Sequence, residues 1–373
     1  MFLALREMRR AVVRFALLAA SVGLLVFLIL SQQTLQAGLI TSFIGAIEHQ
    51  SSPVLVYSVD GLRNLEGSVI TPDLEQQIRA VDGVGAAGRI GQGTFSVTAD
   101  GDVTSAAVIG YEDERLGAPT TLTVGRLPSN ADEVVALDTA ADEGFGLGDS
   151  LTVEPGGLEL AVVGQASEIG LQAAPTLFTT YETFERVVTA ANPDSGGALP
   201  AVIGVAPADG VTDGELVQGI DDSVPDAEAL TRTDAAKGTP GIDQIQQSFQ
   251  VIFLLYGLVV PLVTGLFFLI LTLQKAGALT LLRAVGVTGG SLVRSLLSQV
   301  AIVLVLGIGI GIALYAPLAS QRLGSIPLSF QTGAVVFWSV LLFVLGILSA
   351  LVSARRVLRI DPIEATTGAG VKA

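Results

Sequence analysis

The sequence contains no cysteine, one histidine, three lysines and one tryptophan. Without cysteine there can be no disulfide, no thiolate metal site, no cysteine nucleophile and no lipid-anchored cysteine. A single histidine, His49, is too few for a zinc site or a Ser-His-Asp triad, and no acid pair has a catalytic spacing. We therefore expect the chain not to be an enzyme and to hold no cofactor of its own.

Signals for nucleotide and nucleic-acid binding are also missing. No GxxxxGK[ST] motif occurs, so the chain has no P-loop for ATP. Residues 83–88 match GxGxxG by letter, but the pattern predicts a helix before them where a dinucleotide-binding fold needs a strand. No stretch is basic enough for a nucleic-acid surface. We expect no nucleic-acid partner, and ATP must be bound by a separate subunit if it drives this chain.

Apolar residues make up half of the 373 positions, and the mean hydropathy is +0.64. The acids are distributed unevenly, since residues 48–245 hold 32 of the 35 acids but only 8 of the 20 lysines and arginines. The central part is therefore strongly negative and the remainder is positive. This combination predicts a membrane protein with a soluble insert, whose two parts face different compartments.

Four apolar runs are each long enough to cross a bilayer, which takes about 20 residues of helix. They cover residues 11–30, 251–273, 292–318 and 335–352. Basic residues cluster before the first run, after the last run and between the second and third, whereas the loop between the third and fourth has only Arg322. The clustered bases are Arg6, Arg9, Arg10, Arg14, Lys275, Arg283, Arg294, Arg355, Arg356 and Arg359. The positive-inside rule then predicts a multi-pass protein of the cell membrane with cytoplasmic N- and C-termini.

The first apolar run could instead be a signal peptide, because residues 35–37 form a tolerable cleavage site. The run is longer than the apolar part of such a peptide, about 7–15 residues, and this favours a permanent span. Apolar residues continue at helical spacing to Ile47, so we expect the first helix to extend beyond the membrane as a stalk. In the second run, Pro261 predicts a bend or a feature that shapes a pathway.

Within the acidic insert, short runs of β-branched and aromatic residues alternate with turn residues. This pattern predicts an α+β extracytoplasmic domain, and so a fold of four transmembrane helices with that domain between the first two. Expected strands cover residues 54–59, 94–98 and 106–110, a hairpin joins 150–153 to 158–163, helices cover 73–81 and 181–190, and loops cover 194–199 and 207–214.

The predicted organisation has three parts. Residues 1–47 form the cytoplasmic N-terminus, the first transmembrane helix and the stalk; residues 48–245 form the extracytoplasmic domain; and residues 246–373 form the other three spans, with a cytoplasmic coupling loop at 274–292 and a C-terminal tail. Gly307 and Gly311 form a GxxxG pair in the third span. Such a pair lets helix backbones approach closely, within the bundle or across a dimer.

Several polar side chains are expected at the outer end of the spans. Glu48 and His49 end the stalk, and Tyr57, Tyr256 and Tyr315 are expected at outer-leaflet depth. Haem iron accepts histidine and in some proteins oxygen ligands, so these five residues are candidate ligands for haem, with Glu48 or His49 as the axial ligand. The alternatives are an exposed stalk histidine and interfacial tyrosine anchors. No other metal site is predicted.

Two segments carry a family resemblance. Residues 274–288 read QKAGALTLLRAVGVT and residues 354–365 read ARRVLRIDPIEA. Both resemble MacB/FtsX-type permeases of ABC transporters, in which a span ends in a short cytoplasmic helix; the acid that usually precedes the motif glycine is absent before Gly277. In the insert, residues 125–128, 132–135 and 146–153 resemble the extracytoplasmic domain of the same family. The resemblance implies contact with the ATPase through Lys275, Gly277, Leu279, Leu282, Arg283, Ala284 and Gly286.

Residues 39–64 resemble the HrtB/DevC branch of this family, whose HrtB members export haem. The resemblance implies a homodimer of permeases in membrane lipid, working with two copies of a separate ATPase, and haem efflux from the membrane is the first functional hypothesis. A second hypothesis is a mechanotransmitting permease that acts on a cell-envelope partner, a peptide, an antibiotic or a lipid. A third is a membrane-anchored enzyme or sensor.

Overall fold

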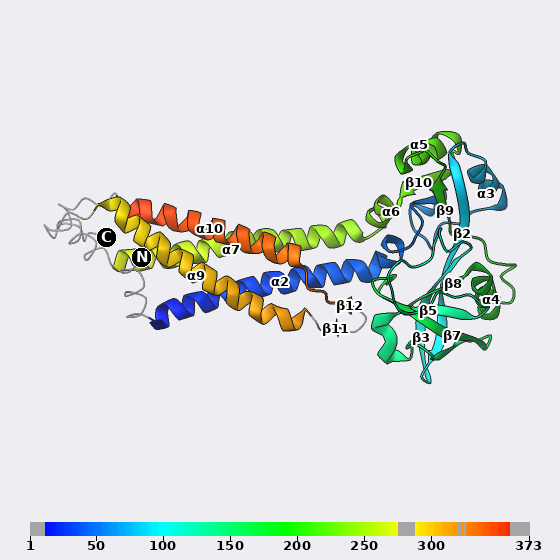
Figure 1. Ribbon diagram of the computed structural model, residues 1–373, viewed down its shortest axis with the longest axis horizontal. Helices are drawn as coiled ribbons and strands as arrows, with labels where there is room; N and C mark the ends of the chain where they lie inside the picture. The colour runs from blue at the N-terminus through cyan, green and yellow to red at the C-terminus, as the bar shows by residue number, and fades with distance from the viewer. Residues whose placement is uncertain (1–11, 275–287, 320–321, 324–325, 359–373) are drawn as a thin grey trace. The chain divides into compact units, whose positions relative to one another are not determined.

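The computed structural model describes residues 12–274, 288–319, 322–323 and 326–358 (Figure 1). The chain divides into two compact units. We call residues 1–36, 247–321 and 328–373 the helical unit, and residues 37–246 with 322–327 the sheet unit.

The long helices are α2 (Val12–Glu48), α7 (Ile242–Gln274), α9 (Gly289–Leu318) and α10 (Thr332–Leu358) (Figure 1). Each contains a stretch long and apolar enough to cross a membrane, which confirms the four predicted spans. Helix α2 runs without interruption for 37 residues, so the predicted continuation of the first span is also confirmed. Pro261 lies inside α7, and its carbonyl oxygen accepts a hydrogen bond of 2.7 Å from Ser349 Oγ on α10.

Glycines let α2 and α9 pack backbone against backbone. A Cβ atom added at Gly307 would lie 2.7 Å from Val22 Cβ, and one at Gly311 would lie 2.6 Å from Val26 Cβ. The same holds in reverse for Gly23 on α2, where a Cβ atom would lie 2.9 Å from Ile310 Cγ2. The two glycines of the GxxxG pair therefore receive valines from another helix of the same chain, and we call this contact the glycine seam.

The sheet unit is built on a mixed sheet of ten strands (Figure 1). Nine strands follow the order β10-β1-β9-β2-β3-β8-β5-β7-β4, and β6 pairs with β2 and β7. The pairs β3–β8 and β5–β7 are parallel, and the other pairs are antiparallel. The strands are β1 (Val54–Ser58), β2 (Val84–Ala99), β3 (Asp102–Tyr111), β4 (Leu122–Gly125), β5 (Glu133–Leu137), β6 (Ser150–Glu154), β7 (Leu158–Ala166), β8 (Thr176–Thr180), β9 (Val202–Pro207) and β10 (Ala227–Thr231).

Four α-helices and two short 3-10 helices complete this unit. They are α3 (Pro72–Arg79), α4 (Tyr181–Ala191), α5 (Asp213–Ser223), α6 (Arg232–Gly238), η1 (Val59–Gly61) and η2 (Asp138–Glu143). A separate two-stranded ladder joins β11 (Arg322–Leu323) to β12 (Ile326–Pro327).

Most local predictions for the insert are confirmed. The β6–β7 hairpin, helices α3 and α4 and strand β1 lie where the pattern predicted them, and α3 precedes residues 83–88 as expected. Strand β2 begins already at Val84, so it is longer than the predicted strand at 94–98. The loop predicted at 207–214 is wrong at its end, because α5 already begins at Asp213. Its start is fixed by a capping box in which the Thr212 side chain accepts from the Glu215 amide and Glu215 accepts from the Thr212 amide.

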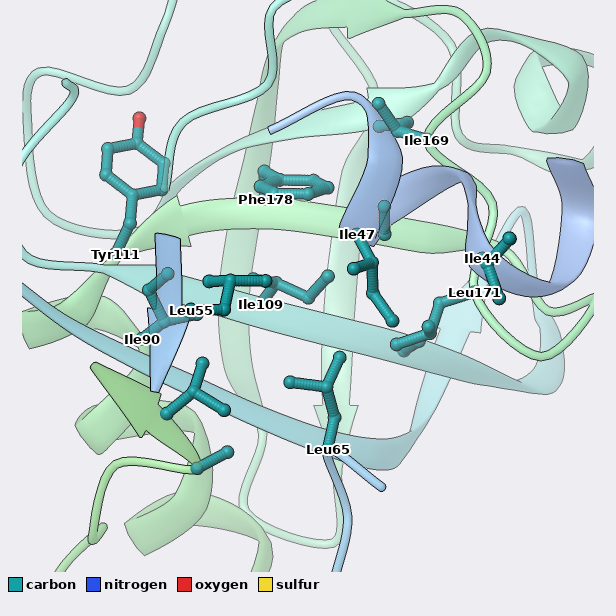
Figure 2. Packing of buried hydrophobic residues seen from close by; sticks show 14 of the residues in the cluster. Ile44, Ile47, Leu55, Leu65, Ile90, Ile109, Tyr111, Ile169, Leu171 and Phe178 are labelled. Atoms are coloured by element: carbon teal, nitrogen blue, oxygen red, sulfur yellow. The ribbon is translucent and has the colours of Figure 1, made fainter. Parts of the chain in front are cut away.

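Strand β1 shows how the sheet buries both of its faces. Val54 and Val56 belong to the core formed with α3 and α5, whereas Leu55 and Tyr57 point to the opposite face because side chains alternate along a strand. That opposite face is covered by the last turns of α2, whose Ile44 and Ile47 belong to one buried cluster with Leu55, Ile109 and Phe178 (Figure 2). The end of the stalk is therefore part of the core of the sheet unit.

The loop before β5 is held by the carboxylate of Glu133. This group accepts hydrogen bonds from Arg126 Nη1 at 2.7 Å and from the backbone amides of Ser129 and Asn130 at 2.9 and 3.0 Å. The Arg126 guanidinium, followed by the Asn130 side chain and the two amides, holds the pKa of Glu133 well below its usual range. The ionised form is therefore the one that the fold stabilises.

Replacement of Glu133 by glutamine should make stability depend less on pH. Because the pKa is lowered by folding, the wild type gains stability above the pKa of the unfolded chain, about 4.3, and loses it as pH falls below that value. We expect Glu133→Gln to lower the melting temperature at pH 7 by a few degrees and the difference to shrink below pH 4, as measured by circular dichroism of the detergent-solubilised protein. A difference that is constant with pH would contradict this account.

Candidate functional site

The end of α2 is gripped by the loop between β7 and β8. The Ala46 amide donates to the Gly170 carbonyl at 3.0 Å, and the Gln172 and Ala173 amides donate to the Phe43 and Ser42 carbonyls at 3.2 and 2.8 Å. These bonds join the loop to the last two turns of the helix through main-chain atoms alone. We call residues 42–50 together with 168–174 the clamp.

Two glycines make this contact sterically possible. A Cβ atom at Gly45 would lie 2.2 Å from the Glu168 carbonyl oxygen, and one at Gly170 would lie 2.9 Å from Ser42 Cα. The loop itself is strained, because Glu168, Gln172 and Ala173 have φ angles of 59°, 53° and 58°, a region that non-glycine residues seldom adopt. The geometry of the clamp is thus imposed by tertiary packing.

His49 belongs to the clamp. Its Nε2 atom lies 3.5 Å from Glu168 Oε2, its Nδ1 atom lies 3.3 Å from the Gly45 carbonyl oxygen, and its own carbonyl accepts from the Thr120 amide at 2.8 Å. The imidazole is a quarter exposed. The neighbouring Glu48 is exposed, at the last residue of α2. Of the predicted haem candidates, Glu48 and His49 are therefore neighbours in the chain, and the Glu48 carboxylate is at the surface.

Tyr57 is fully buried in β1, and its hydroxyl has no hydrogen-bond partner among the described residues. Burial, with a smaller effect from the Glu228 carboxylate, raises the pKa of the Tyr57 phenol above its ordinary value. The side chain is therefore a neutral member of the core, and an external ligand could reach it only if the core opened.

In the helical unit, Tyr315 is also buried and already hydrogen-bonded. Its hydroxyl lies 2.6 Å from Thr34 Oγ1 on α2 and accepts from the Gln331 amide just before α10. Nearby, Trp338 Nε1 on α10 donates to Gln33 Oε1 on α2 at 3.3 Å. These contacts fasten α2, α9 and α10 to one another at one end of the bundle, with aromatic groups of the kind that favour a membrane interface.

Tyr256 is partly buried on α7 and packs against the hydrophobic cluster of the helical unit that contains Tyr315 and Trp338. The five haem candidates thus fall into two surroundings: Glu48, His49 and Tyr57 in the sheet unit, and Tyr256 and Tyr315 in the helical unit. Among the described residues, no group of three or more histidine, cysteine or acidic side chains could hold a metal ion.

The residues predicted to contact an ATPase all lie outside the described residues. They are Lys275, Gly277, Leu279, Leu282, Arg283, Ala284 and Gly286. The helices that border this segment end at Gln274 and begin at Gly289. Arg14 Nη1 on α2 donates to Gln274 Oε1 at 3.0 Å, which joins α2 to α7 next to the segment.

The residues that the sequence interpretation missed are Gly45, Gly170 and Glu168. Glycine inside an apolar helix destabilises it by about 1 kcal/mol relative to alanine, so Gly45 in the run IGAIE was a signal of close packing. Nothing in the sequence indicated that its partner would be a loop more than a hundred residues away.

Replacement of Gly45 by alanine should force the clamp apart, because the new methyl group would meet backbone atoms that cannot rotate away. We expect a loss of about 1–3 kcal/mol of stability, as for other overpacked sites, and faster proteolysis within residues 168–174. Gly214→Ala is the matched control, since a Cβ atom there meets nothing within 4 Å. Equal melting temperatures and cleavage rates for the two variants would contradict the close contact.

Comparisons with known proteins give the following similarities. No family model matches the chain. An uncharacterized ABC transporter permease of Mycobacterium tuberculosis (strain H37Rv) is 25% identical over 373 residues, which is 99% of this chain and 99% of that protein. A putative hemin transport system permease protein HrtB of Staphylococcus haemolyticus is 27% identical over 110 residues, 30% of this chain and 31% of that protein.

Two solved structures are similar to part of the chain. The periplasmic region of MacB from Actinobacillus actinomycetemcomitans matches with a TM-score of 0.37 and 15% identity, over 54% of this chain and 94% of that one. The extracellular domain of the transporter YknZ from Gram-positive bacteria matches with a TM-score of 0.34 and 12% identity, over 48% and 99%. The sequence similarity runs from end to end and agrees with four membrane-spanning helices around a sheet-rich insert. The chain is therefore similar along its whole length to an ABC transporter permease and over part of its length to HrtB, in agreement with the resemblance of its sequence to MacB/FtsX-type permeases.

Proposed function

We propose that two copies of this permease work with two copies of a separate ATPase to export an amphiphilic substrate from the membrane, with haem as the first candidate. The observation that carries the proposal is the course of α2, one unbroken helix of 37 residues whose first part lies in the glycine seam and whose end lies in the clamp. At 1.5 Å per residue such a helix is about 55 Å long.

The contacts suggest how the ATPase would do its work. The coupling loop joins α7 to α9. Helix α9 packs against α2 through glycines so closely that the two helices could slide past each other only if they first moved apart. Movement of α9 would therefore carry α2 with it, because packed helices move as rigid bodies. The clamp would then pass that movement to the sheet unit, since it holds α2 by main-chain hydrogen bonds.

The charge distribution supports an orientation with both termini and the coupling loop in the cytoplasm and the acidic insert outside. Because the chain has no cysteine, single cysteines can be introduced without a background. We expect a membrane-impermeant maleimide to label Asp194→Cys in intact cells and Lys372→Cys only after lysis. Labelling of both positions in intact cells would refute the proposed topology.

Support for haem comes from HrtB, a relative whose name describes hemin transport, and from the pair of side chains at the end of α2. Glu48 is exposed, and His49 has a nitrogen directed at Glu168, from which it would have to separate before it could bind iron. The buried Tyr57 and the hydrogen-bonded Tyr315 are poorer ligands in this conformation. We therefore propose Glu48 or His49 as the axial iron ligand, and His49 would bind iron in competition with the Glu168 contact.

Haem titration followed at the Soret band tests these roles. We expect one of the two variants, Glu48→Ala or His49→Ala, to weaken binding by at least about tenfold, because it would remove the axial ligand. Glu168→Gln should bind haem at least as tightly as the wild type, since it frees the imidazole. Tyr57→Phe is the matched control and should leave the spectrum unchanged. No saturable Soret shift in the wild type would remove haem from the proposal and leave the permease assignment intact.

The clamp also favours a second candidate function, in which the sheet unit is moved to act on a cell-envelope partner and no substrate crosses the membrane. In that case the ATPase cycle would still move α2, but haem would not stimulate ATP hydrolysis. Haem-stimulated hydrolysis by the permease and ATPase complex would favour export, and hydrolysis that responds only to an envelope protein would favour mechanical action.

A further inference from the structure

A groove of about 450 Å³ lies between the beginning of α9 and α10 in the helical unit. Its walls include Val293, Leu297 and Ala301 on α9 and Ile347 on α10, so most of its lining is apolar. One cation, Arg294, stands at its edge with an exposed side chain. An apolar trough with a single charge at one end has the shape and polarity that an amphiphile requires.

The charge of Arg294 is not balanced by the described part of the chain. Residues 12–36, 247–274, 288–319 and 328–358 of the helical unit contain no aspartate or glutamate. Arg294 forms no ion pair with any described residue, and the nearby start of α9 has no side-chain cap on its amides. Among the described residues, this end of the groove therefore carries a net positive charge, which favours a ligand with a negative charge.

The depth of the groove in the membrane identifies the kind of ligand. The apolar stretch of α9 that could cross a membrane begins at Val293, so in a bilayer Arg294 would lie at the level of the lipid headgroups. Ala301 would lie two helical turns, about 10 Å, deeper. Ile347 lies inside the span of α10, which ends at Val352. A segment of a soluble partner would have to enter the bilayer to fill this groove, whereas a lipid chain is already there.

We propose that the groove binds one anionic phospholipid as a resident ligand, with its phosphate at Arg294 and an acyl chain along Leu297, Ala301 and Ile347. The proposed occupant is distinct from the exported substrate of the proposed function, because the groove lies in the helical unit whereas Glu48 and His49 lie in the sheet unit. By filling the space between α9 and α10 next to the coupling loop, the lipid would support the position of α9.

Native mass spectrometry of the full-length permease tests the proposal. The protein is placed in nanodiscs of phosphatidylcholine mixed with an equal part of phosphatidylglycerol and then released, and the retained lipids are counted. We expect the wild type to retain phosphatidylglycerol in preference to phosphatidylcholine. Arg294→Gln should lower that preference about fivefold, the effect of one basic residue near an anionic membrane surface.

Two further variants separate the groove from general charge attraction. Ala301→Phe fills the acyl-chain part without a change of charge and should also reduce phosphatidylglycerol retention. Arg14→Gln removes another exposed arginine of the helical unit that lies outside the groove, and it should retain phosphatidylglycerol as the wild type does. Equal losses in Arg14→Gln and Arg294→Gln would overturn the proposal.

The same variants identify other occupants. If Arg294→Gln lowers retention but Ala301→Phe does not, the site binds an anion without a chain, and the lipid proposal is wrong. If neither variant alters lipid retention while Arg294→Gln weakens co-purification of the ATPase, the groove is a seat for the partner protein and the proposal is equally overturned.

Discussion

The approach of two backbones at Gly45 and Gly170 is the constraint on which the rest of the sheet unit depends. The loop at 168–174 can form main-chain hydrogen bonds with the last turns of α2 only because neither glycine has a Cβ atom. That contact places Ile44 and Ile47 over one face of the sheet, where they complete a core that the strands alone would leave open (Figure 2). A helix that spans the membrane thereby becomes a core element of a folded domain.

A second glycine contact joins the first half of α2 to α9. Gly307 and Gly311 hold Val22 and Val26, so a sideways shift of α9 must displace α2 or open a void. Polar contacts add fixed points, with Tyr315 and Thr34 at one end of the bundle and Arg14 and Gln274 at the other. These contacts are those expected if the helices move as whole units, as the proposed action of a separate ATPase would require.

The proposed haem ligands at the end of α2 belong to the clamp, so the proposed mechanism couples ligand binding to the conformation of the clamp. The His49 imidazole faces the Glu168 carboxylate, so in the proposed mechanism a ligand that binds the imidazole would compete with that contact. Such competition would link occupancy of the site to the grip on α2, as required of any ligand that shifts an equilibrium between two states.

The sequence alone determined the four spans, the continuation of the first helix, and several strands and helices of the insert, because hydrophobic runs and local turn chemistry need no knowledge of distant residues. The sequence also determined the distribution of charge, since the acids gather in residues 48–245 and most of the basic residues lie in the rest of the chain. Only the tertiary structure decided that His49 faces Glu168, that Tyr57 is sealed in a core and that the glycine pair of α9 receives α2. These contacts join residues that are far apart in the chain. Their partners are selected by steric fit between backbones, and such a fit leaves no periodic pattern in the sequence.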